Sequence, residues 1–410
     1  MTAPVRIREI AAGGDGVGTL EDGRTVFVPR AAPGDLVELA DLRLHKRFAR
    51  ARVGRLVEPG PDRVAPRCGH YDGDQCGGCQ LQHLAGPAQR AARGAIVGAA
   101  LRRLAKRDLP DPEVEAAPEE WGYRARVTLA VQGGGRRIGF HRHDRPGEVF
   151  DLRRCEIADP ALQRLWGAVR ELRSMLPPGL VHVGLRADRE GGLHLVLEPG
   201  DTTAWNGADR LHAELARKDV AATIWWDPPG GAPRTLAGAA EAFPATVFEQ
   251  VHPAMGDRVR AWALDQLGEV AGLHAWDLYA GIGESTSVLA GRGATVESVE
   301  SDRRAVALAE QRGPSAGVTR HAGRVEDTLP RLRHPDLVIT NPPRTGMEER
   351  AVAGLVAAAP GRIAYVSCDP ATLARDLTRL GEAYRITALR AFDLFPQTAH
   401  VETVTLLERT

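Results

Sequence analysis

The hydrophobic pattern of the last third of the chain alternates short apolar segments with amphipathic ones. A helical pattern at 251–270 is followed by four apolar runs at 274–281, 294–302, 335–343 and 361–370, and each run precedes a helical pattern. This alternation is typical of βαβ units around a parallel sheet. The tail, 384–409, predicts two strands joined by a turn near Pro396, an antiparallel hairpin at the sheet edge. Residues 246–410 therefore predict an α/β fold, a doubly wound Rossmann-like sheet.

The preceding residues show the shorter period of β-structure. In 1–60, brief apolar runs are separated by turn signals at 13–18, 21–23 and 32–35, which predicts a small β-barrel. A Pro-, Gly- and Cys-rich passage follows, with a helix expected near 87–106. Residues 121–200 alternate again around one helix near 160–175. We therefore expect three units, a barrel over 1–60, a β-rich central domain over 61–245 and the α/β domain over 246–410, which suits a length of 410 residues.

Composition narrows the class of protein. Hydrophobic residues make up 43% and charged residues 26%, ordinary values for a globular protein. The first residues hold no apolar core of a secretory signal, and the longest apolar run, 351–359, is far below the ~18 residues of a membrane span. We expect a cytoplasmic, monomeric protein with no membrane partner. Five cysteines, an odd number, favour metal ligation or catalysis over disulfides in a reducing compartment.

The charge distribution indicates a nucleic-acid partner although the formal net charge is zero. Eight Lys or Arg lie between Arg43 and Arg67, against two acids, Glu58 and Asp62, and a second basic cluster spans 102–107. Binding phosphates requires local positive potential rather than a positive total. A solvated charged face remains an alternative for either cluster.

A glycine-rich turn marks a candidate nucleotide site. The sequence Asp277-Leu-Tyr-Ala-Gly-Ile-Gly283 ends an apolar strand and opens a helix, where glycines let the backbone approach a ligand. Glu300 closes the next strand and is placed to accept hydrogen bonds from ribose hydroxyls. The pattern is not GxGxxG, which favours S-adenosylmethionine over NAD and leaves NAD as the alternative.

Cys368, in Ser-Cys-Asp-Pro, ends another strand and is a candidate nucleophile. Ligands bind at the carboxyl ends of such strands, and the following helix N-terminus favours a thiolate. A buried structural thiol is the alternative, disfavoured because a neighbouring strand ends in Asn341-Pro-Pro-Arg344. A thiolate added to carbon 6 of uracil makes carbon 5 nucleophilic toward a methyl donor. The hydrogen on carbon 5 must then leave, and Glu402, expected on the final edge strand, is the best-placed base.

These motifs, NPPR with Gly346, SCDP and HVETV, resemble the 5-methyluridine RNA methyltransferase family. The resemblance implies that Cys368 is the nucleophile and Glu402 the base, and it makes residues 1–60 similar to an RNA-binding TRAM domain, an OB-like barrel. It further implies an S-adenosylmethionine site. The residues assigned to that site are Gln250 of the Phe248-Glu-Gln-Val motif, Tyr279, Glu300 and Asn341. Two positions depart from the family, which usually has Asp in place of Asn341 and Asn in place of His252.

The other four cysteines, Cys68, Cys76, Cys79 and Cys155, resemble the ligands of the family's iron–sulfur branch. Seven residues separate the first two, where the family pattern has five. Four thiolates suit either zinc or an iron–sulfur cluster, and the spacing leaves both open. The resemblance favours a [4Fe-4S] cluster.

Three other functions remain to be compared. An amino-group methyltransferase would carry an aromatic residue in place of Arg344, and a cytosine carbon 5 enzyme would carry a cysteine in the NPPR motif. A protein that binds RNA with lost or altered activity is the third alternative, for which Asn341 is the evidence. Transfer RNA and ribosomal RNA are both open as substrates.

Overall fold

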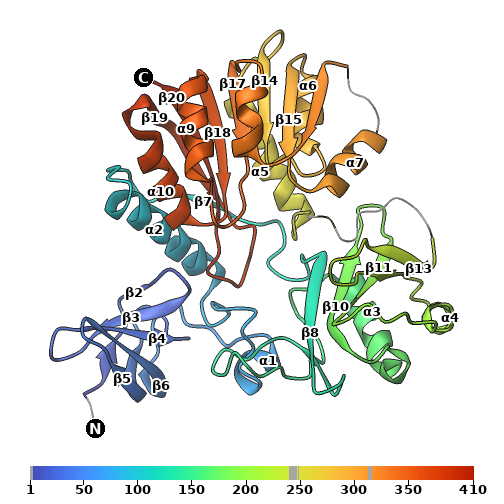
Figure 1. The fold of residues 1–410 in the computed structure, drawn as a ribbon. Helices are drawn as coiled ribbons and strands as arrows, with labels where there is room; N and C mark the ends of the chain where they lie inside the picture. The colour runs from blue at the N-terminus through green and yellow to red at the C-terminus, as the bar shows by residue number, and fades with distance from the viewer. Residues whose placement is uncertain (1–2, 240–246, 248, 313–315) are drawn as a thin grey trace.

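The computed structural model describes residues 3–239, 247, 249–312 and 316–410, and within them the strands form three sheets (Figure 1). The sheets follow one another along the chain, apart from one short strand. The N-terminal sheet is drawn in blue, the central one in green and the C-terminal one in orange and red. The predicted boundary between residues 245 and 246 lies outside the described residues, and the domain limits stay a prediction.

The N-terminal sheet is curled. Its strand order is β1-β5-β6-β4-β3-β2, and β1 and β2 are successive parts of one segment, so the two ends of the sheet meet in that segment. Between them the Ile7 N–H donates to Asp35 and the Arg8 N–H to Val17. Alternate apolar residues fill the interior. The strands are β1 Val5–Arg6, β2 Glu9–Ile10, β3 Asp15–Thr19, β4 Thr25–Pro29, β5 Leu36–Leu44 and β6 Phe48–Glu58.

The central sheet carries helices on one face. Its order is β13-β12-β11-β10-β8-β9, antiparallel except for the parallel pair β11 and β12. Inward-facing residues such as Leu129, Leu185 and Leu197 pack on α3 and α4. The elements are β8 Arg126–Gln132, β9 Arg137–Gly139, α3 Pro160–Glu171, β10 Leu180–Ala187, β11 Leu193–Pro199, α4 Ala208–Ala216, β12 Thr223–Trp226 and β13 Arg234–Ala237.

The C-terminal sheet has eight strands in the order β16-β15-β14-β17-β18-β20-β19-β7. Its first five strands are parallel, whereas β20 is antiparallel to both neighbours. The strands are β14 His274–Leu278, β15 Thr295–Glu300, β16 Val318–Ala322, β17 Leu337–Thr340, β18 Arg362–Ser367, β19 Tyr384–Phe392 and β20 Glu402–Arg409. The expected hairpin is present, but β20 is not an edge strand. It pairs with β18 on one side and β19 on the other, because the chain returns between them.

Helices cover both faces of this sheet, as the doubly wound pattern predicts. Trp276, Ile363 and Tyr365 face a core shared with α2, α9 and α10, while Ala275 and Ala364 face a second core shared with α5 and α6. Side chains of successive strand residues point to opposite faces, so continuous apolar strands supply both cores. The helices are α5 Pro253–Gln266, α6 Glu284–Gly291, α7 Arg303–Gln311, α8 Val325–Thr328, α9 Glu349–Ala358 and α10 Pro370–Leu380.

Two elements from the Cys-rich passage belong to this C-terminal layer. Helix α2, Gly86–Arg103, packs against α10, and Figure 1 shows the two helices side by side. Strand β7, Val114–Glu115, pairs parallel with β19 and forms the edge of the sheet. A short helix, α1 Gly69–Gly73, precedes them. No helix among the described residues combines the length and apolar content that a membrane crossing requires.

Candidate active site

One cavity of about 1080 Å³ lies where the carboxyl ends of the parallel strands face the Cys-rich segment and the central sheet. Ligands bind at this end of doubly wound sheets. The structure brings to its wall all ten residues that the sequence predicts for the site. They are Cys68, Cys76, Cys79, Cys155, Gln250, Tyr279, Glu300, Asn341, Cys368 and Glu402.

The glycine-rich turn after β14 has a backbone that opens toward the cavity. Tyr279, Gly281 and Gly283 all have positive φ, at 60°, 57° and 78°, a conformation that glycine adopts without strain and tyrosine rarely adopts. Beneath the turn, buried Asp277 accepts a 2.6 Å hydrogen bond from the Thr286 hydroxyl of α6. Burial raises the pKa of Asp277 to about 6. The strained Tyr279 is therefore held at a position that lines a ligand cavity.

Glu300 ends β15 and braces this turn. One carboxylate oxygen accepts the Gly281 N–H at 2.9 Å and the other accepts the Asp302 N–H at 2.7 Å. The Ser301 hydroxyl also donates to that second oxygen, at 3.2 Å. A carboxylate offers about four acceptor positions, so one remains open for a ribose hydroxyl, on the oxygen that accepts the Gly281 N–H. Gln250 lies across the cavity before α5. A side chain on Gly256 would come within 2.8 Å of the Gln250 Cβ, so the glycine leaves room for Gln250. Phe248 of the same motif lies outside the described residues.

Cys368 lies between the end of β18 and the start of α10. Asp369 caps that helix by accepting the Thr372 N–H at 2.8 Å, and the thiol is half-buried. Contrary to the expectation from the helix N-terminus, the pKa of Cys368 is raised, to about 11. Burial is the main cause, and the nearby Glu402 adds to it, while Arg344 opposes it.

Glu402 is the first residue of β20 and lies in the strand next to Cys368. Its neighbour Thr403 pairs with Ser367 across β18 and donates its hydroxyl to the Ser367 carbonyl at 3.0 Å. The Glu402 side chain is buried, and burial raises its pKa to about 8. A carboxyl group in such an environment takes up and gives up protons near neutral pH, as a catalytic acid or base must.

Arg344 is a functional candidate to which the sequence reasoning assigned no role. It is exposed on the cavity wall, and its positive charge lowers the pKa of both Cys368 and Glu402. Arg344 belongs to the NPPR motif, so the motif could have identified it as a candidate.

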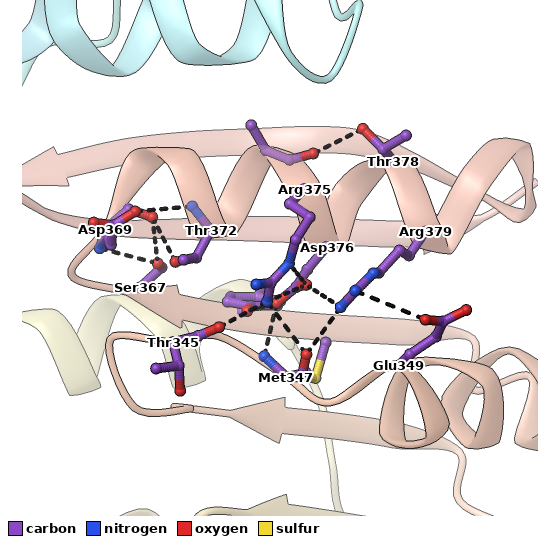
Figure 2. A network of polar contacts seen from close by, with 12 residues as sticks. Thr345, Met347, Glu349, Ser367, Asp369, Thr372, Arg375, Asp376, Thr378 and Arg379 are labelled. Atoms are coloured by element: carbon purple, nitrogen blue, oxygen red, sulfur yellow. Dashed lines mark hydrogen bonds and ion pairs between the residues drawn. The ribbon is translucent and has the colours of Figure 1, made fainter. Parts of the chain in front are cut away.

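The loop that carries Asn341 and Arg344 is fixed to α10 by buried Asp376 (Figure 2). Asp376 accepts the Met347 N–H at 2.8 Å, the Tyr365 hydroxyl at 2.7 Å and the Arg375 guanidinium at 2.8 Å. Arg375 in turn donates to the Thr345 carbonyl at 2.8 Å. Loop and helix thus form one rigid unit.

Asn341 itself lies at the β17 end, where its N–H donates to the Leu278 carbonyl at 3.2 Å and its side chain is exposed to the cavity. His252, the other departure from the family, is buried and is not among the residues that line the cavity. Its ring stacks on Tyr123 with centroids 4.8 Å apart. Of the two positions that differ from the family pattern, only Asn341 can therefore contact a molecule bound in the cavity.

The four remaining cysteines lie close enough to influence one another. Cys76 and Cys79 are buried, and Cys68 and Cys155 are half-buried. Burial, and then the neighbouring thiols, raise the pKa of Cys76 to about 12. Among the described residues, no group of three or more His, Cys, Asp or Glu side chains is arranged as a site for a single metal ion. The donor set facing the cavity from this segment is nevertheless made of thiols, which suits a cluster of soft metal ions.

Comparison with known proteins identifies the family of the chain. The model of the family described as tRNA (Uracil-5-)-methyltransferase matches residues 317–410. A 23S rRNA (uracil(1939)-C(5))-methyltransferase of Thiobacillus denitrificans is 32% identical, with 100% of both chains covered, and one of Nitrosospira multiformis is 33% identical, covering 100% of this chain and 99% of the other. The chain therefore belongs to the family of S-adenosylmethionine-dependent RNA (uracil-C5) methyltransferases.

A solved structure supports the fold over nearly the whole chain. The Pyrococcus abyssi tRNA (uracil-54, C5)-methyltransferase, in complex with S-adenosyl-L-homocysteine, superposes with a TM-score of 0.72 at 24% identity, covering 98% of this chain and 99% of that one. The α/β methyltransferase fold and the curled N-terminal sheet are thereby confirmed.

Proposed function

We propose that this enzyme methylates carbon 5 of a uridine in 23S ribosomal RNA, with Cys368 as nucleophile and Glu402 as base. The observation that carries the assignment of roles is the placement of Cys368 directly after β18 and of Glu402 at the start of the adjoining strand β20, at the cavity that also holds the glycine-rich turn. Relatives that match the full length are named as 23S rRNA enzymes, which favours ribosomal RNA over transfer RNA as substrate.

The proposed chemistry uses the thiol and the carboxylate in turn. The Cys368 thiolate forms a bond to carbon 6 of uracil, and the electron pair of the carbon 5–carbon 6 double bond moves to make an enolate. S-adenosylmethionine supplies the methyl group that carbon 5 then binds. Glu402 takes the proton from carbon 5, the double bond re-forms, and the carbon 6–sulfur bond breaks to return the thiolate. Without the base, methylated RNA stays attached to Cys368.

We propose that Gln250, Tyr279, Glu300 and Asn341 hold S-adenosylmethionine. The Glu300 carboxylate would accept a ribose hydroxyl at its remaining acceptor position, and the open backbone of the glycine-rich turn lets the cofactor approach. In place of the usual aspartate, Asn341 offers a donor and an acceptor but no charge.

We propose that the curled N-terminal sheet is a TRAM-like, OB-like RNA-binding barrel. Some of the basic residues between Arg43 and Arg67 are neutralised, because Arg52 pairs with Asp41 and Arg55 with Glu38. The tip of the β5–β6 hairpin, residues 43–48, is different. Arg43, Lys46 and Arg47 are exposed there, and the His45 and Phe48 rings stack with centroids 4.4 Å apart. Exposed cations beside aromatic rings suit phosphates and bases of single-stranded RNA.

We further propose that Cys68, Cys76, Cys79 and Cys155 hold a [4Fe-4S] cluster. The thiol donor set supports this, together with the apolar surroundings of Tyr71, Tyr123 and Ile157. The ligands come from the Cys-rich segment and the central sheet region, so a cluster would pin two distant parts of the chain together.

The experiment that tests the function uses 23S rRNA from a strain that lacks this gene, with transfer RNA as second substrate. Cys368→Ala should bind RNA and cofactor but form no 5-methyluridine, because the other four cysteines at the cavity are the proposed cluster ligands. Nucleoside mass spectrometry measures the product. Thr378→Ala, an exposed change on α10, is the control and should retain activity. Substantial product from Cys368→Ala would disprove the nucleophile, and product in transfer RNA alone would disprove the substrate.

A further inference from the structure

The segment that leads into Glu402, residues 393–401, is a loop with an unusual degree of burial. Most connecting segments run over the surface, because a buried loop must find partners for its backbone polar groups. Here Asp393, Gln397 and Thr398 are each at most 3% exposed. Phe395 and His400 from the same loop line the active-site cavity. Whatever holds this loop therefore contributes, together with the pairing of Glu402 with Phe392, to the position of the proposed base.

Helix α2 holds the loop through a pair of glutamines. Gln89 donates to the side-chain oxygen of Gln397 at 2.9 Å and accepts the Gln397 N–H at 3.0 Å. Gln397 has a positive φ of 70°, so these bonds fix a backbone conformation that non-glycine residues seldom adopt. The Gln397 carbonyl accepts the N–H groups of Gln80 and Leu81, at 3.1 and 3.0 Å, directly after Cys79.

A buried ion pair, one helical turn further along α2, holds both ends of the loop. Arg93 donates to the Asp393 carboxylate at 2.7 Å and to the Thr398 carbonyl at 2.9 Å. The arginine and aspartate side chains are 0% and 2% exposed. Buried charges of this kind hold a geometry firmly, since displacing either leaves the other unpaired.

We infer that Gln89 and Arg93 are positioning residues for proton removal by Glu402. Neither lines the cavity, so both act through the loop. The inference rests on the proposed role of Glu402. A base must lie within hydrogen-bond reach of the proton it removes, and a displacement of about 1 Å costs on the order of a hundredfold in rate.

The two chemical steps depend on different supports. Cys368, Tyr279 and Glu300, proposed to serve methyl transfer, follow or end β18, β14 and β15, which the parallel sheet holds. Glu402 pairs with Phe392, the last residue of β19, and its neighbour Thr403 pairs with Ser367 of β18. The buried loop 393–401 joins Phe392 to Glu402, so it supports the end of the ladder at which the base lies. Loosening the loop should therefore slow proton removal and leave methyl transfer almost unchanged.

The test compares the two steps in one variant. Gln89→Leu removes both bonds to Gln397 and keeps an apolar side chain of similar size. The reaction is followed over a single turnover, with enzyme in excess over RNA labelled with tritium at carbon 5 of uridine. Methyl incorporation should stay within about twofold of wild type, and tritium release should slow by about tenfold or more. Denaturing gels should show RNA attached to the protein.

Controls separate this inference from the proposed function. Glu402→Gln is the reference and should trap the adduct fully. Gln163→Leu removes a half-buried glutamine that donates to the Ala158 carbonyl at 2.9 Å in the central region, and it should release tritium normally. If Gln89→Leu does not fold, Arg93→Lys is the second variant. It keeps the positive charge but loses the two-pronged hydrogen-bonding geometry of the guanidinium.

The outcomes are distinguishable. If Glu402→Gln traps no adduct, the proposed base is wrong and the inference falls with it. In the other case, Glu402→Gln traps the adduct, but Gln89→Leu changes neither step or slows both equally. The inference alone is then overturned, and the same holds for Arg93→Lys if it takes the place of Gln89→Leu.

Discussion

In Cys368 and Glu402, the effect of burial on the pKa is larger than the effect of the nearby positive charge of Arg344. A helix N-terminus stabilises a nearby anion by about 0.3–1 kcal/mol, less than one pKa unit, whereas burial shifts pKa values by up to about 3–5 units. The pKa of Cys368 therefore rises to about 11 despite its place before α10. That direction could not be predicted from the sequence, which identifies the helix but not how deeply the thiol lies.

The pH dependence of adduct release follows from Glu402. Because its pKa is raised to about 8, the carboxyl keeps its proton below that pH and becomes a base as the pH rises through it. Adduct formed at pH 6 should persist, and a jump to higher pH should release it with a midpoint of about 8. Gel electrophoresis after quenching measures the fraction attached. The Glu402→Gln adduct should not respond to the jump, and equal release at pH 6 and pH 9 in wild type would contradict the assignment.

At the element scale, α10 and the 341–348 loop act as one unit through Asp376. Gly346 has a positive φ of 73°, and a Cβ there would come within 2.6 Å of the Asp376 carboxylate. The glycine therefore permits the close approach that lets Asp376 accept the Met347 N–H. The sequence predicted the helix and the motif, since both depend on local pattern, but not the buried aspartate that joins them.

Asp376→Asn should destabilise the fold and slow methylation. The amide keeps one acceptor oxygen and replaces the other with an NH2 group, which puts a donor either against the Met347 N–H and the Tyr365 hydroxyl or against the Arg375 guanidinium. Buried polar groups on that side lose their partner, at a cost of about 3 kcal/mol. Urea unfolding and methylation rate measure the two effects. Glu349→Gln, at the exposed border of this network, is the matched control and should change stability by less than about 0.5 kcal/mol. An Asp376→Asn protein as stable as wild type would contradict this account.

The strand order of the C-terminal sheet could be predicted only in part from the hydrophobic pattern of the sequence. Strand and helix alternation indicated the parallel strands and the final hairpin. It did not indicate that β20 lies inside the sheet, or that β7 and α2, from the Cys-rich passage, complete the C-terminal layer. The contacts of β7 and α2 join residues about three hundred positions apart, as with Arg93 and Asp393, and no local period in the sequence indicates them.

At the scale of the whole molecule, the cavity is assembled from segments that no single motif spans. The ten predicted residues could be named from their motifs, since all but Gln250 stand at a strand end or in a cysteine pattern and Gln250 belongs to the Phe248-Glu-Gln-Val motif. Their meeting at one cavity depends on the Cys-rich segment docking against the loop before Glu402, through Gln80, Leu81 and Gln397. The proposed cluster would thus lie beside the support of the base.

The proposed cluster should be detectable by its iron and sulfide content. Protein purified without oxygen should contain about four iron and four inorganic sulfide per chain, with a broad visible absorption. Cys79→Ser should lose the iron, and Cys368→Ser, a thiol change on the same cavity wall, should retain it. Because the backbone after Cys79 donates to Gln397, loss of the cluster should also lower thermal stability and increase protease cleavage within 68–81. Elemental analysis and limited proteolysis measure both effects, and one zinc per chain without visible absorption would show instead that the four thiols bind a single ion.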